Sequence, residues 1–472
     1  MTIRYPRVHR DVFVLVALLL LAGCATAMKI PSETELQSAQ QFEVRRLDNP
    51  ALEGFMEAGG APVSAWPLRT WNVNQLNLAA FYYSPDLDVA RAQWHTVKAA
   101  EITAGQIPNP SVGFSPTWDE TNLYHLFLPF NLNVPVETVG KRELRIQNAQ
   151  DQSKSAQYKI LSAAWTVRNR LINSLIDCYA ADQSLALYRK QAEDQKPIVD
   201  LFEQRTASGQ SLSLNASQIL VAYQQTLLAE KDAERQQAEA KADLASALGV
   251  PLDAVASLKI DWNNIASVDK RDRVLIAGSY KTALKHNADL MAALADYTAA
   301  HSALQLELAK RIPDIDIGPG YDWSRNGDIY TLGISITLPI FNDNEGPIAE
   351  AEARREEAAR KFNALQAKII GNIEIARAGY RTSFAKLKRA NDLLEAEQAK
   401  IKRLSTQLDG GAVAKLPLLL ARSEIETAAI ARLEAQVQWL KAKAALEYAL
   451  ERPLFGGEVN DRLTAANPRA KP

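Results

Sequence analysis

The side chains that could carry catalytic or metal chemistry are few and scattered in this 472-residue chain. Its five histidines and two cysteines do not recur at the spacing of a metal site. No G-x-S-x-G or H-E-x-x-H motif occurs. Val139–Arg142 contains a Gly-Lys pair but lacks the upstream glycine and the Ser or Thr of a phosphate-binding loop. We therefore predict no enzyme activity, no cofactor and no metal site.

Cys24 is the residue whose neighbours predict a covalent modification. A basic head with Arg4, Arg7 and Arg10 precedes an apolar stretch of residues 12–22, the pattern of a signal peptide. The stretch ends in Leu-Ala-Gly-Cys at residues 21–24 and resembles the bacterial lipobox, in which the cysteine sulfur is diacylated. Acyl chains hold a protein on a membrane with about 0.8 kcal/mol per buried CH₂ group. We expect Cys24 to be the lipid anchor. Because Ala25 rather than an aspartate follows it, the resemblance places the anchor in the outer membrane.

Composition and charge exclude several classes of protein. Hydrophobic residues make up 47% and charged residues 23% of the chain, which is typical of a folded protein. The formal net charge is −1, so no nucleic-acid partner is predicted. No apolar run reaches about 18 residues, the length that a membrane-spanning helix needs.

The chain contains an internal duplication. Residues 240–252 and 442–454 share eight of 13 residues at an offset of 202. A weaker match at an offset of 203 begins at Asp86-Leu87 and Asp289-Leu290. Both halves should therefore have one topology.

Each half predicts a helix, two strands, a long helix and a last helix. In the first half we expect helix over 85–107, strands near 111–118 and 123–135, and helices over 137–208 and up to 248. In the second half we expect helix over 275–311, strands near 314–323 and 328–340, and helices over 346–408 and up to 450. A leucine-rich heptad seam from Leu387 to Leu408 predicts that the long helices form a coiled coil.

The last strand has the clearest pattern. Apolar residues alternate with small or polar ones, and we expect the apolar set to face lipid: Tyr330, Leu332, Ile334, Ile336 and Leu338. About ten alternating residues are typical of a transmembrane β-strand. A half-buried sheet of a water-soluble fold alternates in the same way, so the pattern alone leaves both open.

Four strands per chain are too few to close a barrel in a bilayer, where no sheet edge can stay open. Three chains of four strands would give 12, an even number as in bacterial barrels. The membrane interpretation therefore predicts a homotrimer.

Taken together, these features resemble the TolC family of outer-membrane factors. The resemblance covers about residues 70–455 and depends on the doubled unit, Pro108-Asn109-Pro110-Ser111-Val112-Gly113, Leu128-Pro129, Leu338-Pro339, Gly209 and Gly411. It implies a mainly α fold with a membrane β-barrel: a long α-helical coiled-coil barrel and four β-strands per chain, in a trimer with a 12-stranded β-barrel.

The resemblance also implies a function. The chain would be the exit duct of a tripartite efflux or type I secretion system in the cell outer membrane, a passive conduit in contact with outer-membrane lipid. Its partners would be a periplasmic adaptor and an inner-membrane transporter of RND, ABC or MFS type. The cargo stays open among drugs, metal ions, peptides and proteins.

The resemblance places the periplasmic gate at the ends of the helical hairpins. The expected gate residues are Ser208, Gly209, Gln210, Asn215, Gln218, Asp409, Gly410, Gly411, Lys415, Pro417 and Leu420. Some members of the family carry aspartate rings beyond the second glycine, where this chain has Pro417 and Leu420. We expect closure here mainly by apolar and neutral groups.

The implied organisation is a signal peptide (1–23), a lipid-anchored segment (24–75), a first efflux repeat (76–250), an equatorial linker (251–274), a second efflux repeat (275–455) and a C-terminal tail (456–472). A periplasmic adaptor lipoprotein is the alternative, since adaptors also contain a helical hairpin. An enzyme is a more distant one. The doubled hairpin and the ten-residue strands favour the channel.

Overall fold

The computed structural model describes residues 35–60, 65–115, 117–118, 126–208, 213–262, 265, 280–324 and 327–455. Cys24, the signal peptide and the C-terminal tail lie outside the described residues. The chain divides into two units, residues 1–45 and residues 46–472. In the first unit, α2 (Glu35–Glu43) ends close to Arg45, whose guanidinium lies 5.1 Å from the centre of the Phe42 ring.

The second unit holds the duplicated part. Its first half contains α3 (Pro50–Ala58), α4 (Val73–Tyr83), α5 (Pro85–Ala104), β1 (Ser111–Phe114), β2 (Thr117–Trp118), β3 (Leu126–Val136), α6 (Lys141–Ala207), α7 (Ser213–Leu248) and the 3₁₀ turn η2 (Leu252–Ala254). Its second half contains α10 (Tyr280–His286), α11 (Ala288–Ala309), β4 (Ile315–Ser324), β5 (Gly327–Ile336), α12 (Glu345–Asp409) and α13 (Lys415–Leu450). The order helix, strands, long helix, helix occurs in both halves.

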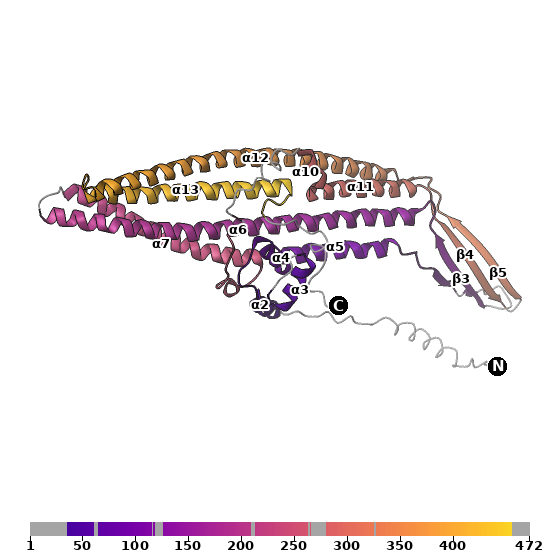
Figure 1. The fold of residues 1–472 in the computed structure, drawn as a ribbon. Helices are drawn as coiled ribbons and strands as arrows, with labels where there is room; N and C mark the ends of the chain where they lie inside the picture. Colours follow the sequence, from indigo (N-terminus) through magenta and orange to yellow (C-terminus); the bar gives the residue numbers. More distant parts are fainter. Residues whose placement is uncertain are drawn as a thin grey trace. The chain divides into compact units, whose positions relative to one another are not determined.

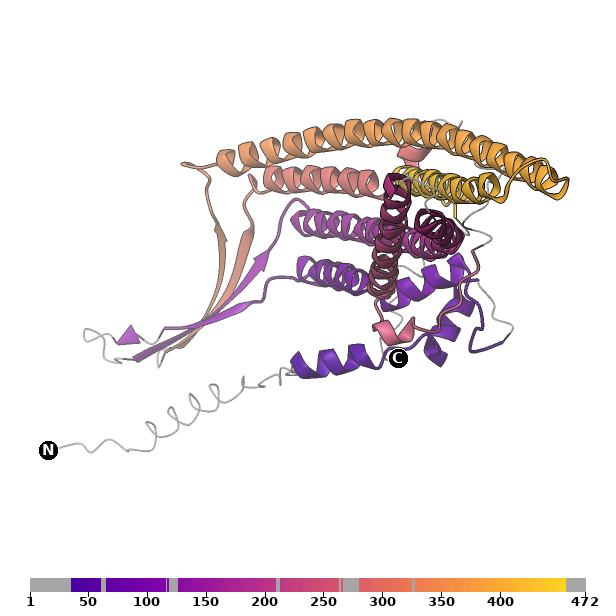
Figure 2. The same cartoon turned by 90° about the vertical axis from the view of Figure 1, so that its left-hand side faces the viewer.

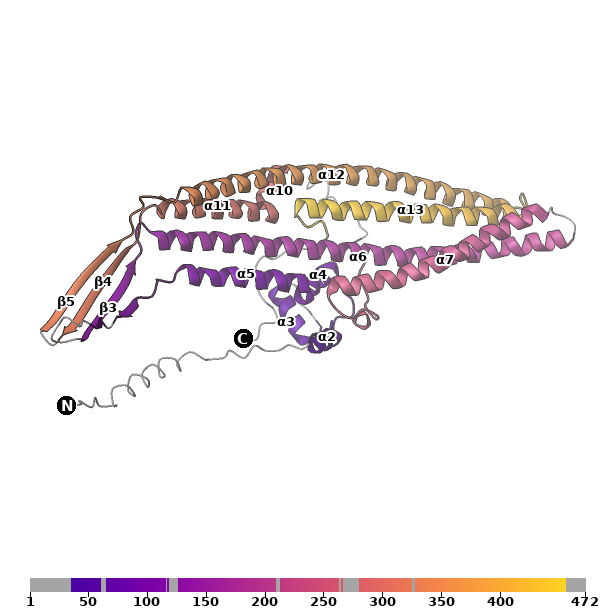
Figure 3. The same ribbon diagram turned by 180° about the vertical axis from the view of Figure 1, so that it is seen from behind.

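The helices of this unit run side by side (Figure 1 and, from behind, Figure 3). α6 packs against α7, and α12 packs against α13, so that each half ends in a helical hairpin. α6 also contacts α5, α11 and α13, and thus joins the two halves. The strands lie at one end of the helices, and the ends of α6 and α12 and the starts of α7 and α13 lie at the other (Figure 1).

The 65 residues of α12 form a helix for local reasons. Oppositely charged side chains one turn apart stabilise its exposed face, as in the Glu350–Arg354 and Glu356–Arg360 pairs. Leu387 of the predicted heptad is buried, while Leu394, Ile401 and Leu408 are half-buried. The seam is therefore only partly covered in a single chain.

The strands form one antiparallel sheet in the order β1-β3-β4-β5, and β2 pairs with the far end of β3 (Figure 2). β1 and β2 thus lie beside β3 as two pieces of one interrupted strand. The β3–β4 pairing joins the two halves of the chain, with Phe130 opposite Tyr321 and Val134 opposite Ile317. β4 and β5 pair from Ser324–Gly327 down to Ile315–Ile336.

Three predicted boundaries were wrong. The helix over 275–311 is split at Asn287, whose side chain caps α11 by accepting a hydrogen bond from the Leu290 N–H (2.9 Å). The strand over 111–118 is divided into β1 and β2. The strand over 328–340 ends at Ile336, because its partner β4 begins opposite it at Ile315 and Pro339 has no N–H to donate. Leu338 is therefore exposed in the connection to α12 and is not part of the strand.

A continuous hydrophobic core fills the middle of this unit. Trp439 and Leu440 of α13, Leu171 of α6, Leu76 of α4 and Phe455 are almost fully buried in it. Within the described part of the chain, no helix combines the length and the apolar character that crossing a bilayer requires.

Candidate functional site

One face of the sheet is apolar and exposed. Register places apolar residues of neighbouring strands side by side in rows, one of which runs Phe114–Phe130–Tyr321–Tyr330. On β5, Tyr330 is 79% exposed, Leu332 70%, Ile334 67% and Ile336 47%. Such a large exposed apolar surface marks a region that another apolar phase or partner covers. The predicted alternation of β5 is therefore present as an exposed surface.

The opposite face of the sheet is small and polar. Asn131, Gly320 and Thr331 lie in one row of it, and Asp316 pairs with Ser335 in another. The Asn133 amide lies 3.4 Å from the Asp316 carboxylate across the sheet. The two faces thus differ in the way that the lipid side and the water side of a membrane sheet differ.

Both outer edges of the sheet are open among the described residues. β5 pairs with β4 alone, and β1 pairs with β3 alone. Unpaired backbone N–H and C=O groups of an edge strand can pair with the edge of another chain.

Charged residues from both halves meet where the strands join the helices. Lys141, at the start of α6, is buried, and its ammonium donates to the Asp314 carboxylate and to the Ile312 carbonyl, both at 2.6 Å. Asp314 also accepts from the Thr138 N–H (3.0 Å). Arg145 pairs with Glu137 in the same region. These ties fix the ends of β3 and β4 to the helices.

The second hairpin turn and the adjoining ends of α12 and α13 contain six of the predicted gate residues. Gly411 has φ +71°, and the Ala412 N–H donates to the Gln407 carbonyl at 2.8 Å, which closes the end of α12. All six are exposed: Asp409, Gly410, Gly411, Lys415, Pro417 and Leu420. Proline is tolerated at residue 417 because it lies in the first turn of α13.

The end of α6 and the start of α7 lie at the same end of the unit (Figure 1). Ser208 follows α6, and its N–H donates to the Gln204 carbonyl at 3.1 Å. Gln218 is exposed on α7. Asn215 lies in the first turn of α7, while Gly209 and Gln210 lie outside the described residues.

Sequence reasoning missed a polar ladder between α6 and α13. Gln191 donates to Thr427 (3.2 Å), Gln195 donates to Ser423 (3.3 Å), and Lys190 pairs with Glu426, which is only 2% exposed. These contacts tie the hairpin of one half to the hairpin of the other. The sequence does contain a signal for this ladder: each helix has two polar residues four apart, Gln191 and Gln195 on α6 and Ser423 and Thr427 on α13.

Other ties act within each hairpin. Lys386 donates to Gln438 (2.8 Å) and Arg432 to Asn391 (2.9 Å) between α12 and α13. Arg189 of α6 pairs with Glu234 of α7 at 3.1 Å. The ladder between α6 and α13 is therefore the part of this network that a relative movement of the two hairpins would strain.

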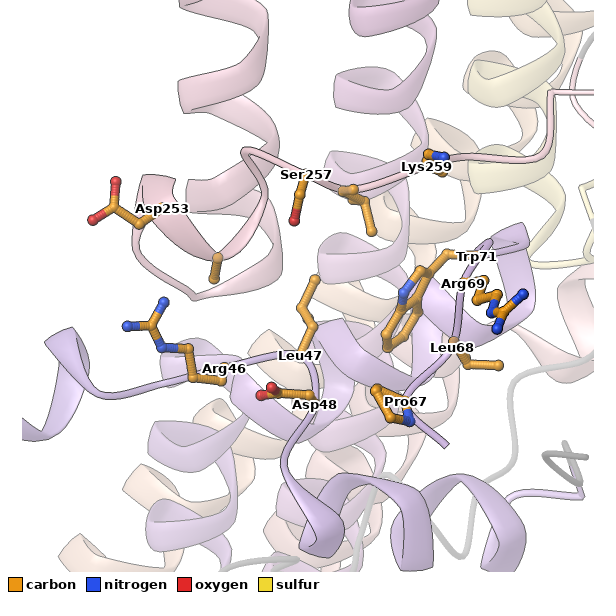
Figure 4. A pocket seen from close by; sticks show the side chains of 12 residues that line it. Arg46, Leu47, Asp48, Pro67, Leu68, Arg69, Trp71, Asp253, Ser257 and Lys259 are labelled. Atoms are coloured by element: carbon orange, nitrogen blue, oxygen red, sulfur yellow. The ribbon is translucent and has the colours of Figure 1, made fainter. Parts of the chain in front are cut away.

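The N-terminal stretch and the linker after α7 meet in a pocket of about 270 Å³. The Trp71 N–H donates to the Lys259 carbonyl (2.8 Å), and the Asp261 N–H donates to the Trp71 carbonyl (2.9 Å). Figure 4 shows the Trp71 indole beside Leu47 and Leu68, with charged side chains further out. The structure thus brings together part of the predicted lipid-anchored segment (24–75) and part of the predicted equatorial linker (251–274).

Comparisons with known proteins agree with this architecture. Residues 279–451 match the family model described as outer membrane efflux protein. The chain is 21% identical over 301 residues to the cobalt-zinc-cadmium resistance protein CzcC of Cupriavidus metallidurans, covering 62% of this chain and 68% of CzcC.

Solved outer-membrane channels share the fold of this chain. The OprN channel superposes with a TM-score of 0.67 at 17% identity, covering 80% of this chain and 89% of OprN. VceC of Vibrio cholerae gives 0.65 at 19% identity, covering 80% and 95%. MtrE of Neisseria gonorrhoeae gives 0.65 at 15% identity, covering 80% and 89%.

The predicted family resemblance, the mainly helical fold with a small antiparallel sheet, and the role of an outer-membrane exit duct for efflux are therefore confirmed. The solved structures that share this fold include outer-membrane channels. Among the described residues, no three His, Cys, Asp or Glu side chains gather as a metal site would require.

Proposed function

We propose that this efflux protein works as a homotrimer whose sheets form one 12-stranded β-barrel in the outer membrane. The observation that carries this proposal is the exposed apolar face of β5 on a sheet with two open edges. Three chains of four strands close the ring, and an even strand number is usual in bacterial barrels. The helices of three chains then surround a periplasmic tunnel.

The tunnel is gated where the hairpins turn. The exposed residues of the second turn, with the ladder between α6 and α13 behind them, form a two-state packing arrangement. Closure uses neutral and apolar groups at Pro417 and Leu420. A periplasmic adaptor engages these ends, and an inner-membrane transporter supplies the energy.

Two repeats, residues 76–250 and 275–455, flank an equatorial linker, and Cys24 carries the acyl chains. The shared element order of the two halves supports the repeats. The lipobox at residues 21–24 supports the anchor. The channel is favoured over a periplasmic adaptor, because the solved structures that share this fold are outer-membrane proteins and include channels.

Electrophoresis and bilayer recording test the proposal. A detergent extract loaded without boiling should migrate at about three times the monomer mass, as the 12-strand ring requires, and should collapse to the monomer after boiling. Planar-bilayer recording should show a small, mostly closed conductance. A monomer before boiling, or a lipid-free soluble chain, would refute the proposed assembly. Labelled acyl chains that still attach to a Cys24→Ser variant would refute the anchor alone.

A further inference from the structure

The long helices of the second unit lie in one layer. Figure 1 shows α12, α13, α6 and α7 from top to bottom on its left side, and α12, α11, α6 and α5 on its right side. Figure 2 shows the same rows one above another. The contacts agree, because α12 packs against α11 and α13, these two pack against α6, and α6 packs against α5 and α7. The helix α12 therefore forms one edge of the layer, and α5 with α7 forms the other.

These two edges continue the open edges of the sheet. The strand β5 leads into α12, and α5 leads into β1. A neighbouring copy that pairs its β1 with β5 therefore brings its α5 and α7 beside α12. Because the two edges differ, such a contact is head to tail, and it closes into a ring only if the rotation between copies allows it.

The side of each edge helix that is turned away from the layer, called here its outer face, exposes apolar side chains. On α7, Leu228 is 68% exposed, and the exposed Val221 lies about two turns away on the same side. On α12, Leu393 is 47% exposed, and the exposed Ile375 lies about five turns away. Exposed apolar side chains that recur along one face of a helix are typical of a surface that a partner covers.

Side-chain contacts across the layer show which parts of α7 and α12 lie at the same height. Glu234 of α7 pairs with Arg189 of α6 at 3.1 Å, and the ladder between α6 and α13 begins at the next residue of α6. On the other side of α13, Arg432 donates to Asn391 of α12 at 2.9 Å. The residues around Glu234 and the residues around Asn391 are therefore at about the same distance from the sheet.

At this height the two outer faces carry complementary charges. On α7, Glu239 and Arg235 form an exposed ion pair at 2.7 Å, in which the glutamate is nearer the sheet. On α12, Arg389 and Asp392 form an exposed ion pair at 3.5 Å, in which the arginine is nearer the sheet. When the two faces meet at this height, the acidic residue of each pair lies opposite the basic residue of the other.

We propose that the outer face of α7 docks on the outer face of α12 of the next copy. The two ion pairs then lie opposite each other, with Arg235 beside Asp392, and Leu228 packs beside Leu393. The partner of each edge is thus a second copy of this chain. This inference rests on the proposed homotrimer and adds the helical contact that joins its subunits outside the sheet.

Cross-linking of the full chain in isolated outer membranes tests the contact. A variant with Leu228→Cys and Leu393→Cys, treated with a short bismaleimide, should give covalent dimers and trimers after boiling and no larger species. Cys178 is buried and should not react. Leu228→Cys with Glu434→Cys is the matched control, because Glu434 is exposed on α13, a helix inside the layer. The control should give several-fold less covalent product.

The outcomes separate this contact from the proposed trimer. A trimer on gels loaded without boiling, with no more covalent product than in the control, would overturn the contact and leave the trimer. A monomer on those gels, with no covalent product, would overturn both. Covalent species of more than three copies would support the contact and overturn the ring of three, because the edges would then join without closing.

An exchange of charges tests which residues face each other. Arg235→Glu places a glutamate opposite Asp392 and should lower the fraction of trimer several-fold, and Asp392→Arg should do the same. The double variant restores opposite charges between copies and should recover the trimer, although α6 and α13 separate α7 from α12 within one chain. Glu434→Lys should leave the fraction unchanged. A double variant with as little trimer as the single variants would contradict this pairing.

Discussion

At the scale of single residues, one buried ion pair joins the two halves to the segment after α13. Arg168 of α6 is fully buried and donates through Nε to the Glu447 carboxylate at 2.8 Å. Glu447 also accepts from the Phe455 N–H at 2.8 Å, and Arg168 donates to the Phe455 carbonyl. A charge that loses its partner in such a place stays buried and uncompensated.

Arg168→Met should lower the free energy of unfolding by about 3–5 kcal/mol, because it leaves the Glu447 carboxylate without its cation. Chemical denaturation in detergent measures this change. Arg360→Ala, which breaks an exposed pair on α12, should cost less than about 1 kcal/mol. If both variants lost the same free energy of unfolding, burial would not make the Arg168–Glu447 pair more important for stability than an exposed pair.

Cys178 is a second residue whose surroundings fix its chemistry. Its thiol is buried and donates to the Ala240 carbonyl at 3.1 Å. Burial, with Asp182 and Asp177, raises the pKa of this thiol to about 12. Since the thiolate is the reactive form, the thiol is almost entirely protonated and unreactive near pH 8.

In a Cys24→Ser variant, where Cys178 is the remaining cysteine of the sequence, iodoacetamide at pH 8 should label the denatured chain and not the folded one. Mass spectrometry of timed samples provides the measurement. Comparable labelling rates in the two states would contradict the buried position of the thiol.

At the scale of elements, alternate residues of β5 belong to the two faces of the sheet, and these faces differ chemically. Leu332 belongs to the exposed apolar face, while Ser335 lies on the polar face opposite Asp316. A charge on the lipid side of a membrane strand is costly because lipid cannot solvate it.

Leu332→Lys should destabilise the proposed barrel by about 2–4 kcal/mol, the cost of a lysine near the middle of the bilayer. Ser335→Lys, placed beside Asp316 on the other face, should be tolerated. The fraction of trimer in the outer-membrane extract, loaded without boiling, measures both effects. If Ser335→Lys lowered the trimer fraction more than Leu332→Lys did, the apolar face would be the one that faces water.

At the scale of the whole molecule, the ladder between α6 and α13 joins hairpins from opposite halves of the chain. Its hydrogen bonds, Gln191–Thr427 and Gln195–Ser423, are single neutral contacts. Each contributes only about 0.5–1.5 kcal/mol, which suits the proposed gate, because such a gate must open and close.

A double variant, Ser423→Ala with Thr427→Val, should raise the open fraction of the channel several-fold, because about 1–2 kcal/mol of closure is lost. Planar-bilayer recording measures the change. Thr382→Val is the matched control, since the Thr382 hydroxyl donates within α12, to the Ala378 and Gly379 carbonyls. If the double variant left the open fraction unchanged, the ladder would not contribute to closure of the gate.

Local patterns in the sequence determined the order of elements, the doubled unit and the two faces of β5. Period-two alternation and helix-stopping Pro and Gly residues act within a few neighbours, so the sequence displays them directly. The same locality explains the errors. The end of β5 depends on where its partner β4 begins, and the break at Asn287 depends on a cap and on Glu451.

Only the tertiary structure decided which polar side chains work together. Gln191 and Thr427, Arg168 and Glu447, and Glu451 and Ala288 come from segments more than 150 residues apart in sequence. Each of these contacts exists because helices of the two halves pack side by side or end to end. A helical pattern shows which face is polar, but the packing of the neighbouring helix decides which residue on that face finds a partner.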